Sequence, residues 1–251
     1  MLHKPTVFID FDDTLSDPIP FFTQFARESA TLFRARFGGD QAEWERAMGD
    51  MLVAVHDDYL VRFVDNPTNG YLDWLKTLRL RSMELVFDAM ELPIPPNAER
   101  LCVETQFTAL SKCNAAFPGA EQMLVELTHQ GYPLHMASGQ ESEYLRAGLT
   151  GLGLAHFFGR LFGPDLVDCA KEGLDYYTRV FEAVGVQSKD VIVVDDYPPA
   201  IGWAVASGAK VIQVQLSPLV HQPIQPGIAA LVTRLRDLPW QIARIAEKRN
   251  S

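Results

Sequence analysis

Three aspartates stand within four residues near the start of the chain, in the segment Asp10-Phe-Asp-Asp-Thr14. They directly follow the apolar run 5–9, which predicts a short buried strand that ends at these carboxylates. Carboxylates crowded beside a buried strand are costly unless a cation is bound. Their oxygens are hard ligands of the kind that Mg²⁺ prefers, and an aspartate can also act as a nucleophile or as a general acid and base.

Three further polar groups are predicted at the ends of other strands. Ser138-Gly139 follows the apolar run 133–137, Lys171 lies in the next unit, and Asp195-Asp196 follows Val191–Val194. Each group alone has an ordinary explanation, since serines and aspartates often cap helices and lysines are usually solvated. Their joint occurrence in this order indicates one site, because ligands of open parallel sheets bind beyond the carboxyl ends of the strands.

The elements that would position these residues alternate between helix and strand after residue 117, which predicts a parallel sheet with helices on both faces. The predicted helices are 119–130, 141–151, 173–184 and 199–207, and the predicted strands are 132–137, 160–162, 191–194 and 211–214. A Pro-rich tail from Leu216 leads to helix-like sequence over 229–248. The predicted fold class is α/β, with a three-layer Rossmann-like core.

Residues 16–114 predict helices only, because apolar residues recur there at helical spacing and no strand pattern interrupts them. A first helix is expected to begin near Pro18 and to end at Gly38-Gly39. Further helices are expected around Trp44 to Tyr59, at about 70–91 and at about 96–113. This block therefore predicts an all-helical insert in the α/β core.

Composition and charge exclude several classes of protein. The 251 residues include 22 Lys and Arg against 32 Asp and Glu, a formal charge of −10, which excludes a nucleic-acid binder that works by neutralising phosphates. The three cysteines are odd in number and lack metal-binding spacing, so neither a disulfide framework nor a zinc site is predicted. The first apolar run starts too early and is too short to follow a cleavable signal peptide, and no run reaches the length of a membrane span, so we expect a cytoplasmic protein without a membrane partner.

The motifs together resemble the haloacid dehalogenase-like (HAD) hydrolase superfamily. The resemblance rests on Asp10-x-Asp12-x-Thr14, Ser138, Lys171 and Asp195-Asp196, and it covers residues 5–15 and about 115–215. The helical insert falls where many members carry a cap domain. The resemblance therefore implies a discontinuous core domain, residues 1–15 and 115–251, and a helical cap domain, residues 16–114.

The resemblance also implies roles for the first motif. Asp10 would attack phosphorus and form an aspartyl-phosphate. Asp12 would protonate the leaving oxygen and later deprotonate water, and Thr14 would steady Asp12 by a hydrogen bond. Ser138 and the backbone at Gly139 would donate to phosphate oxygens.

A Mg²⁺ ion and a charge-neutralising lysine complete the implied site. Asp10, the backbone carbonyl of Asp12, and Asp196 would hold the ion, and Lys171 would offset charge on Asp10 and on phosphate. Asp195 stands where family members often have glycine, and Ala200 stands where a further aspartate is common. The direct metal ligand is thus Asp195 or Asp196, and we favour Asp196.

We predict a Mg²⁺-dependent phosphohydrolase that cleaves a small phosphorylated metabolite, a phosphate monoester. The alternatives are a phosphomutase, a 2-haloacid dehalogenase or phosphonatase-type hydrolase, and a catalytically silent binding member. Asp12 favours phosphate esters, because similar dehalogenases and phosphonatases carry other residues at that position. The insert is expected to set specificity, with His56, Arg62, Trp74 and the turn Asn66–Tyr71 as candidates, although an ordinary helix connection explains them equally well.

Overall fold

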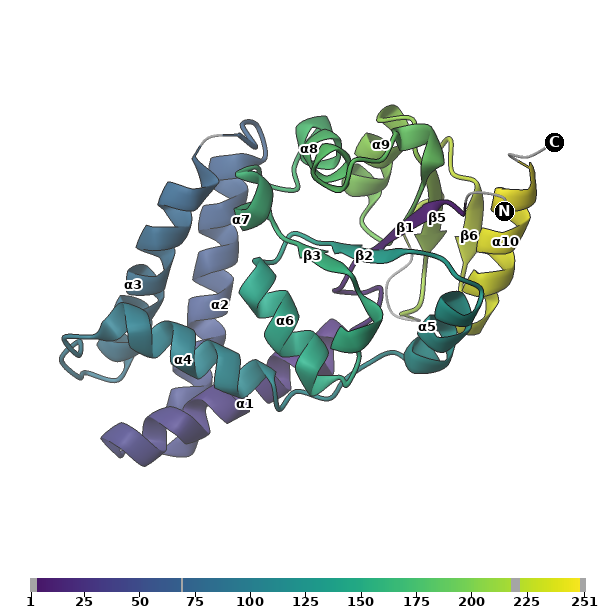
Figure 1. Cartoon of the computed structure of the whole chain (residues 1–251). Helices are drawn as coiled ribbons and strands as arrows, with labels where there is room; N and C mark the ends of the chain where they lie inside the picture. The colour runs from purple at the N-terminus through teal and green to yellow at the C-terminus, as the bar shows by residue number, and fades with distance from the viewer. Residues whose placement is uncertain (1–3, 69, 218–221, 249–251) are drawn as a thin grey trace.

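The computed structural model describes residues 4–68, 70–217 and 222–248, and it contains a parallel sheet with helices on both faces (Figure 1). Within these residues the sheet has six strands in the order β3-β2-β1-β4-β5-β6, and every neighbouring pair is parallel. The strands are β1 (Thr6–Ile9), β2 (Leu134–Ala137), β3 (Arg160–Phe162), β4 (Val191–Asp195), β5 (Lys210–Val214) and β6 (Ala230–Val232). The predicted three-layer α/β core is confirmed.

Successive side chains of β1 enter different hydrophobic clusters, because they point to opposite faces of the sheet. Val7 and Ile9 share a cluster with residues of α5, α6 and α10, whereas Phe8 shares one with residues of α8 and α9. These helices, with the short α7, are α5 (Ala120–His129), α6 (Ser142–Gly151), α7 (Pro164–Val167), α8 (Leu174–Val184), α9 (Pro198–Ala206) and α10 (Leu238–Lys248). Both faces of β1 are therefore buried, which explains why its sequence is a continuous apolar run.

The described residues between β1 and β2 contain helices and no strand, and the long helices among them lie beside the α/β core in Figure 1. They are α1 (Pro18–Phe37), α2 (Gln41–Phe63), α3 (Tyr71–Ala89) and α4 (Ala98–Leu110). Helix α1 begins at Pro18 and ends before Gly38, whose φ of 78° suits glycine. Asp40 caps α2 by accepting from two backbone N–H groups, and Phe33 stacks on Trp44 to join α1 to α2.

The end of the chain differs from the predicted continuous helix over 229–248. Ala230–Val232 forms β6, which pairs in parallel with β5 before α10 begins. A strand of three residues is too short to show a periodic pattern, so the sequence did not distinguish it from the start of the helix.

None of the helices in the described part of the chain combines the length and apolar character needed to cross a membrane.

The register of the central strands brings the predicted motifs to one edge of the sheet. β1 lies between β2 and β4, and Ile9 pairs with Met136 on one side and with Val194 on the other. The residues that follow these partners therefore leave three adjacent strands at the same level. This is the edge of a parallel sheet at which ligands bind.

Candidate active site

Three carboxylates meet beyond the ends of β1 and β4. Asp10, Asp195 and Asp196 each offer an oxygen within 4.8 Å of the others. Asp10 is only 6% exposed and Asp195 is fully buried, so their charges are removed from water. Such a cluster is stable only when cations neutralise it.

Lys171 supplies one buried positive charge to this cluster. Its Nζ lies 2.8 Å from an oxygen of Asp10 and 2.7 Å from an oxygen of Asp195. Burial lowers the pKa of Lys171, but the two carboxylates outweigh burial and hold that pKa well above its ordinary value. Asp195 also accepts from the Tyr177 hydroxyl at 3.1 Å and from the backbone N–H of Tyr197 at 3.0 Å. Both oxygens of Asp195 are thus engaged by the protein.

Asp196 is placed differently from Asp195. It is partly exposed, and one of its oxygens accepts a hydrogen bond of 3.3 Å from the Thr14 hydroxyl. Burial, with the charges of Asp195 and Asp10, raises the pKa of Asp196 to about 9. Burial also raises the pKa of Asp10 to about 7, although Lys171 opposes this rise. Lys171 alone therefore does not neutralise the charge of the three carboxylates. The remaining negative charge of the cluster favours a bound cation.

Asp12 projects from the same loop as Asp10 and is held by two side chains. Ser16 donates to one of its oxygens at 3.2 Å, and the Gln140 amide donates to the other at 2.8 Å. Burial raises the pKa of Asp12, while these two hydrogen bonds oppose the rise. The Asp12 carboxyl is therefore oriented by the fold, and its protonated form is favoured relative to that of an aspartate in water.

Ser138 follows β2 at the neighbouring position of the sheet edge. It is buried, and its hydroxyl oxygen accepts from the backbone N–H of Gln140 at 3.3 Å. The Tyr176 hydroxyl donates to the Ser138 carbonyl at 2.9 Å and so fixes this turn. Gly139 is exposed and lines the same cavity as Asp10. The loop after β2 therefore offers hydroxyl and backbone donors beside the carboxylates.

The loop that carries Lys171 is bonded to the helices between β1 and β2. The backbone N–H of Ala170 donates to the Pro67 carbonyl at 2.8 Å, in the connection between α2 and α3. The Tyr59 hydroxyl of α2 donates to Glu172 at 3.1 Å. These contacts flank Lys171 on both sides, so the helical segment helps to fix the buried lysine.

A cavity of about 1180 Å³ lies between these loops and the helical segment. Its lining includes Asp10, Asp12, Ser138, Lys171 and Asp196. The helices contribute mainly apolar and aromatic side chains, among them Phe22, Phe25, Met48, Leu52, Leu75 and Leu78. The five motif residues therefore face one space, and the helices form most of its wall.

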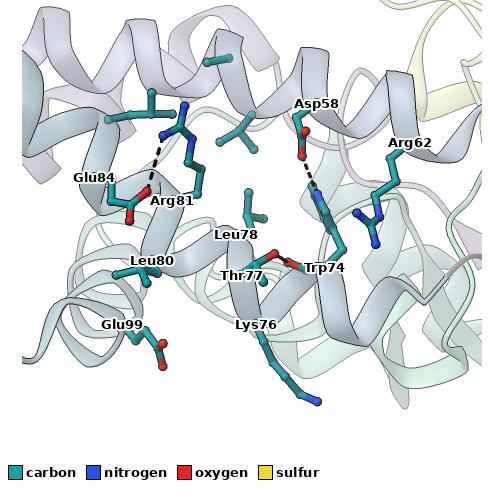
Figure 2. Close-up of a pocket in the computed structure, with 13 residues that line it drawn as sticks. Asp58, Arg62, Trp74, Lys76, Thr77, Leu78, Leu80, Arg81, Glu84 and Glu99 are labelled. Atoms are coloured by element: carbon teal, nitrogen blue, oxygen red, sulfur yellow. Dashed lines mark hydrogen bonds and ion pairs between the residues drawn. The ribbon is translucent and has the colours of Figure 1, made fainter.

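The predicted specificity residues divide between two hollows. His56, Trp74 and Tyr71 line the large cavity, whereas Arg62 lines a second hollow of about 710 Å³ between α2 and α3, which Trp74 also lines. Figure 2 shows this second hollow, in which the Trp74 indole donates to Asp58 at 2.7 Å. Its lining includes none of the motif carboxylates. Asn69, within the predicted turn, lies outside the described residues.

The haloacid dehalogenase-like hydrolase model matches residues 4–204, which include all the motifs described above. The chain belongs to the haloacid dehalogenase-like hydrolase family. The match covers most of the 251 residues, so the superfamily prediction is confirmed. No curated protein sequence is similar to this chain at a significant level.

Solved structures of HAD hydrolases share the fold. An L-2-haloacid dehalogenase from Xanthobacter autotrophicus, with chloropropionic acid covalently bound, is 18% identical with a TM-score of 0.64, over 96% of this chain and 99% of that one. A defluorinating L-2-haloacid dehalogenase is 14% identical with a TM-score of 0.70, over 96% of each chain. A Bacillus subtilis HAD-hydrolase, YfnB, bound to magnesium is 16% identical with a TM-score of 0.62, over 96% of this chain and 99% of that one. At these identities the likeness establishes the fold alone.

One predicted contact of this HAD hydrolase is wrong. The resemblance implies a hydrogen bond from Thr14 to Asp12, but the Thr14 hydroxyl donates to Asp196. The loop turns between them, with Asp13 at a φ of 53°, and this turn directs Thr14 toward β4. Asp12 is held instead by Ser16 and Gln140.

Three residues of the HAD site were not among the residues predicted from the sequence. Gln140 and Ser16 orient Asp12, and Tyr177 donates to Asp195. Gln140 and Ser16 stand only two residues beyond Ser138 and Thr14, so their closeness to the motifs could have identified them. Tyr177 lies on α8, and only the packing of α8 against the sheet brings it to the site.

Proposed function

We propose that this HAD hydrolase is a Mg²⁺-dependent phosphohydrolase that cleaves a small organic phosphate monoester through an aspartyl-phosphate. The observation that carries the proposal is the Asp12 carboxyl, which shares a cavity with Asp10 and is oriented by Ser16 and Gln140. Burial raises the pKa of Asp12, which suits a general acid. An alkoxide leaving group needs a proton, whereas a halide leaves as a stable anion. A positioned acid therefore supports ester cleavage.

Asp10 and Asp12 would share the reaction in two steps. In the first step an Asp10 oxygen attacks phosphorus, the bond between phosphorus and the ester oxygen breaks, and Asp12 gives its proton to that oxygen. In the second step ionised Asp12 takes a proton from water as the water oxygen attacks phosphorus. Asp10 is then released as a carboxylate, together with inorganic phosphate. Each step leaves Asp12 in the protonation state that the next step requires.

Lys171, Ser138 and the backbone at Gly139 would bind the phosphoryl group. Lys171 uses two of its N–H groups on Asp10 and Asp195, and an ammonium group has a third. The Ser138 hydroxyl accepts from Gln140, so its own proton can be donated to a phosphate oxygen. These donors lie beside Asp10, where negative charge develops.

The donor atoms of the site suit Mg²⁺, because they are carboxylate oxygens in a cluster that carries more negative charge than Lys171 neutralises. We propose Asp10, Asp196 and the backbone carbonyl of Asp12 as the ligands. Asp195 is the less suitable ligand, because both of its oxygens are engaged by the protein. When bound, the ion would neutralise charge on the phosphoryl group.

We also propose a division into a core domain, residues 1–15 and 115–251, and a cap domain, residues 16–114. The cavity supports this division, because its floor comes from the sheet loops and most of its wall comes from α1 to α4. A cap over the carboxylates would exclude water and contact the alcohol part of the ester. The substrate would then be a small phosphorylated metabolite.

Haloacid dehalogenation is the second candidate, because two of the three solved structures reported above are L-2-haloacid dehalogenases. That reaction would use Asp10 to displace halide from carbon and would need neither Asp12 nor Mg²⁺. A phosphomutase would use the same residues as the phosphatase but would transfer the phosphoryl group to a second hydroxyl instead of water.

A paired assay separates these candidates. One assay measures release of inorganic phosphate from 4-nitrophenyl phosphate, and the other measures release of chloride from L-2-chloropropionate. Each is run with Mg²⁺ and with EDTA. We expect Mg²⁺-dependent phosphate release and no chloride release. Asp10→Asn should abolish turnover while leaving the circular dichroism spectrum unchanged. Chloride release in EDTA, without phosphate release, would establish the dehalogenase instead.

A further inference from the structure

The cavity above the carboxylates is large and mostly apolar on its cap side. Its volume of about 1180 Å³ exceeds the roughly 300 to 1,000 Å³ typical of ligand pockets. Phe22 and Phe25 of α1, Met48 and Leu52 of α2, and Leu75 of α3 all line it. A compact, fully hydroxylated alcohol would leave hydroxyl groups against these side chains without hydrogen-bond partners. The wall therefore favours a substrate whose alcohol part is largely apolar.

The lysine and arginine side chains that line the cavity are already paired with carboxylates. Among its described lining residues, the lysine and arginine side chains are Lys171 and Arg79. Arg79 of α3 pairs through one terminal nitrogen with Glu141 at 3.0 Å, and Glu141 also accepts from Gln106 at 3.1 Å; the Nε of Arg79 is buried without a partner among the described residues. Lys171 is held by Asp10 and Asp195. Among the described lining residues, no lysine or arginine without a carboxylate partner is therefore available to a second phosphate or a carboxylate, which indicates an uncharged alcohol part.

Two of the hydroxyl groups in this wall are buried without a hydrogen-bond partner among the described residues. Ser29 of α1 and Tyr144 of α6 line the cavity, at 0% and 5% exposure, and neither hydroxyl has a hydrogen-bond partner among the described residues. A buried hydroxyl without a partner is destabilising, so a ligand group that bonds it gains affinity. The Tyr144 ring packs edge-on against Phe11 at 6.2 Å, so it lies beside the loop of Asp10 and Asp12.

We propose that the preferred substrate is a phosphate monoester whose alcohol part is a bulky, uncharged, largely apolar ring or ring system, and that the hydroxyls of Tyr144 and Ser29 bind a polar group on it. This inference rests on the proposed phosphatase activity and adds the class of alcohol. Tyr144 and Ser29 are specificity residues here and take no part in bond breaking.

The preference for an apolar body is tested with two esters of matched shape. Cyclohexylmethyl phosphate and glucose 6-phosphate are both primary alkyl esters that carry a six-membered ring, but only the second ring is hydroxylated. With Mg²⁺ we expect kcat/KM to be at least about 100-fold higher for cyclohexylmethyl phosphate, since small apolar differences in such pockets already change rates by roughly 10- to 200-fold. Equal values, or faster hydrolysis of glucose 6-phosphate, would overturn the inference.

The role of the hydroxyls is tested with cyclohexylmethyl phosphates that carry one ring hydroxyl at position 2, 3 or 4. At least one isomer should exceed the unsubstituted ester by about 5-fold in kcat/KM, as one hydrogen bond provides. Tyr144→Phe or Ser29→Ala should abolish that gain. Tyr132→Phe is the matched control, because the Tyr132 hydroxyl is also buried and unpartnered among the described residues but does not line the cavity. The absence of any gain, or a gain that survives both variants, would contradict the assignment.

4-Nitrophenyl phosphate distinguishes the two levels of the proposal. If it is hydrolysed with Mg²⁺ while cyclohexylmethyl phosphate shows no advantage, the inferred alcohol class is wrong and the phosphatase activity stands. If no phosphate is released from any of these esters, the phosphatase activity is wrong and the inference about its alcohol fails with it.

Discussion

Asp196→Asn should make the metal-free protein more stable while removing its response to Mg²⁺. The reason is that Asp196 stands in a crowded cluster with Asp10 and Asp195, and Lys171 neutralises only part of their charge. Asparagine has nearly the same shape, and its side-chain oxygen can still accept from the Thr14 hydroxyl. The substitution thus removes one charge and one proposed ligand oxygen with little change in packing.

The expected size of the effect follows from the pKa of Asp196, which burial and the charges of Asp195 and Asp10 raise from 3.8 to about 9. A carboxyl whose pKa is higher in the folded state than in the unfolded chain destabilises the fold as the pH rises above the unfolded value. At roughly 1.4 kcal/mol per pH unit, the penalty at about pH 7.5 is at most about 5 kcal/mol. If the substitution restores about 2 kcal/mol of this penalty to the free energy of unfolding, Tm should rise by at least about 4 °C.

The assay is thermal unfolding in EDTA and in a Mg²⁺ titration, at about pH 7.5 and at about pH 5. In EDTA we expect Asp196→Asn to unfold at a higher temperature than the wild type, with the difference shrinking at the lower pH. Saturating Mg²⁺ should stabilise the wild type by about 2.7 kcal/mol at one hundred times Kd, and the variant much less. Asp57→Asn is the matched control, because Asp57 is exposed on α2; it should change neither quantity.

Two results would refute this reasoning. A lower Tm for Asp196→Asn in EDTA would show that the Asp196 charge stabilises the metal-free fold, contrary to the pKa argument. A full Mg²⁺ response in the variant would show that Asp196 is not a ligand. If Asp195→Asn, rather than Asp196→Asn, abolished the response, the assignment of the two aspartates would be reversed.

Two further predictions concern the residues that orient the site. Tyr177→Phe removes the hydroxyl that donates to Asp195, so thermal unfolding should show a loss of about 1 to 3 kcal/mol, whereas Tyr132→Phe should cost much less; equal losses would contradict a special role for that hydrogen bond. Gln140→Ala removes a hydrogen bond that lowers the pKa of Asp12, so that pKa should rise. The alkaline limb of the pH profile of kcat/KM should then move to higher pH, and kcat/KM for an alkyl phosphate should fall by about 10-fold through lost orientation; an unchanged profile would count against Asp12 as the acid.

The convergence of the motifs could be predicted from the sequence, because strand ends in a parallel sheet follow from local pattern and from chain order. Asp10, Ser138 and Asp195 each directly follow an apolar run, and the pairing of β1 with β2 and β4 brings them together as expected. The partner of Thr14 could not be predicted, since it depends on the turn at Asp13. Nor could Tyr177, whose approach to Asp195 depends on how α8 packs against the sheet.

The wall that α1 to α4 form in the cavity shows a second limit of sequence analysis. The helical spacing of Phe22, Phe25 and Met48 predicts buried faces, but it does not show which part of those faces lines a cavity. Ser29 and Tyr144 become informative only in the structure, where their hydroxyls are buried without partners among the described residues. His56 and Trp74 were candidates by position alone and do line the cavity, whereas Arg62 does not.

The most direct test of the account is the detection of a covalent phosphoryl group on Asp10. Asp12→Ala is mixed with 4-nitrophenyl phosphate and Mg²⁺, quenched in acid and examined by intact-mass and peptide mass spectrometry. This leaving group needs little acid assistance, whereas hydrolysis of the intermediate lacks its base, so the intermediate should accumulate. We expect a mass increase of one phosphoryl group on the peptide that contains Asp10, and none in the Asp10→Asn, Asp12→Ala double variant. Release of nitrophenol without that adduct, or an adduct on another residue, would contradict it.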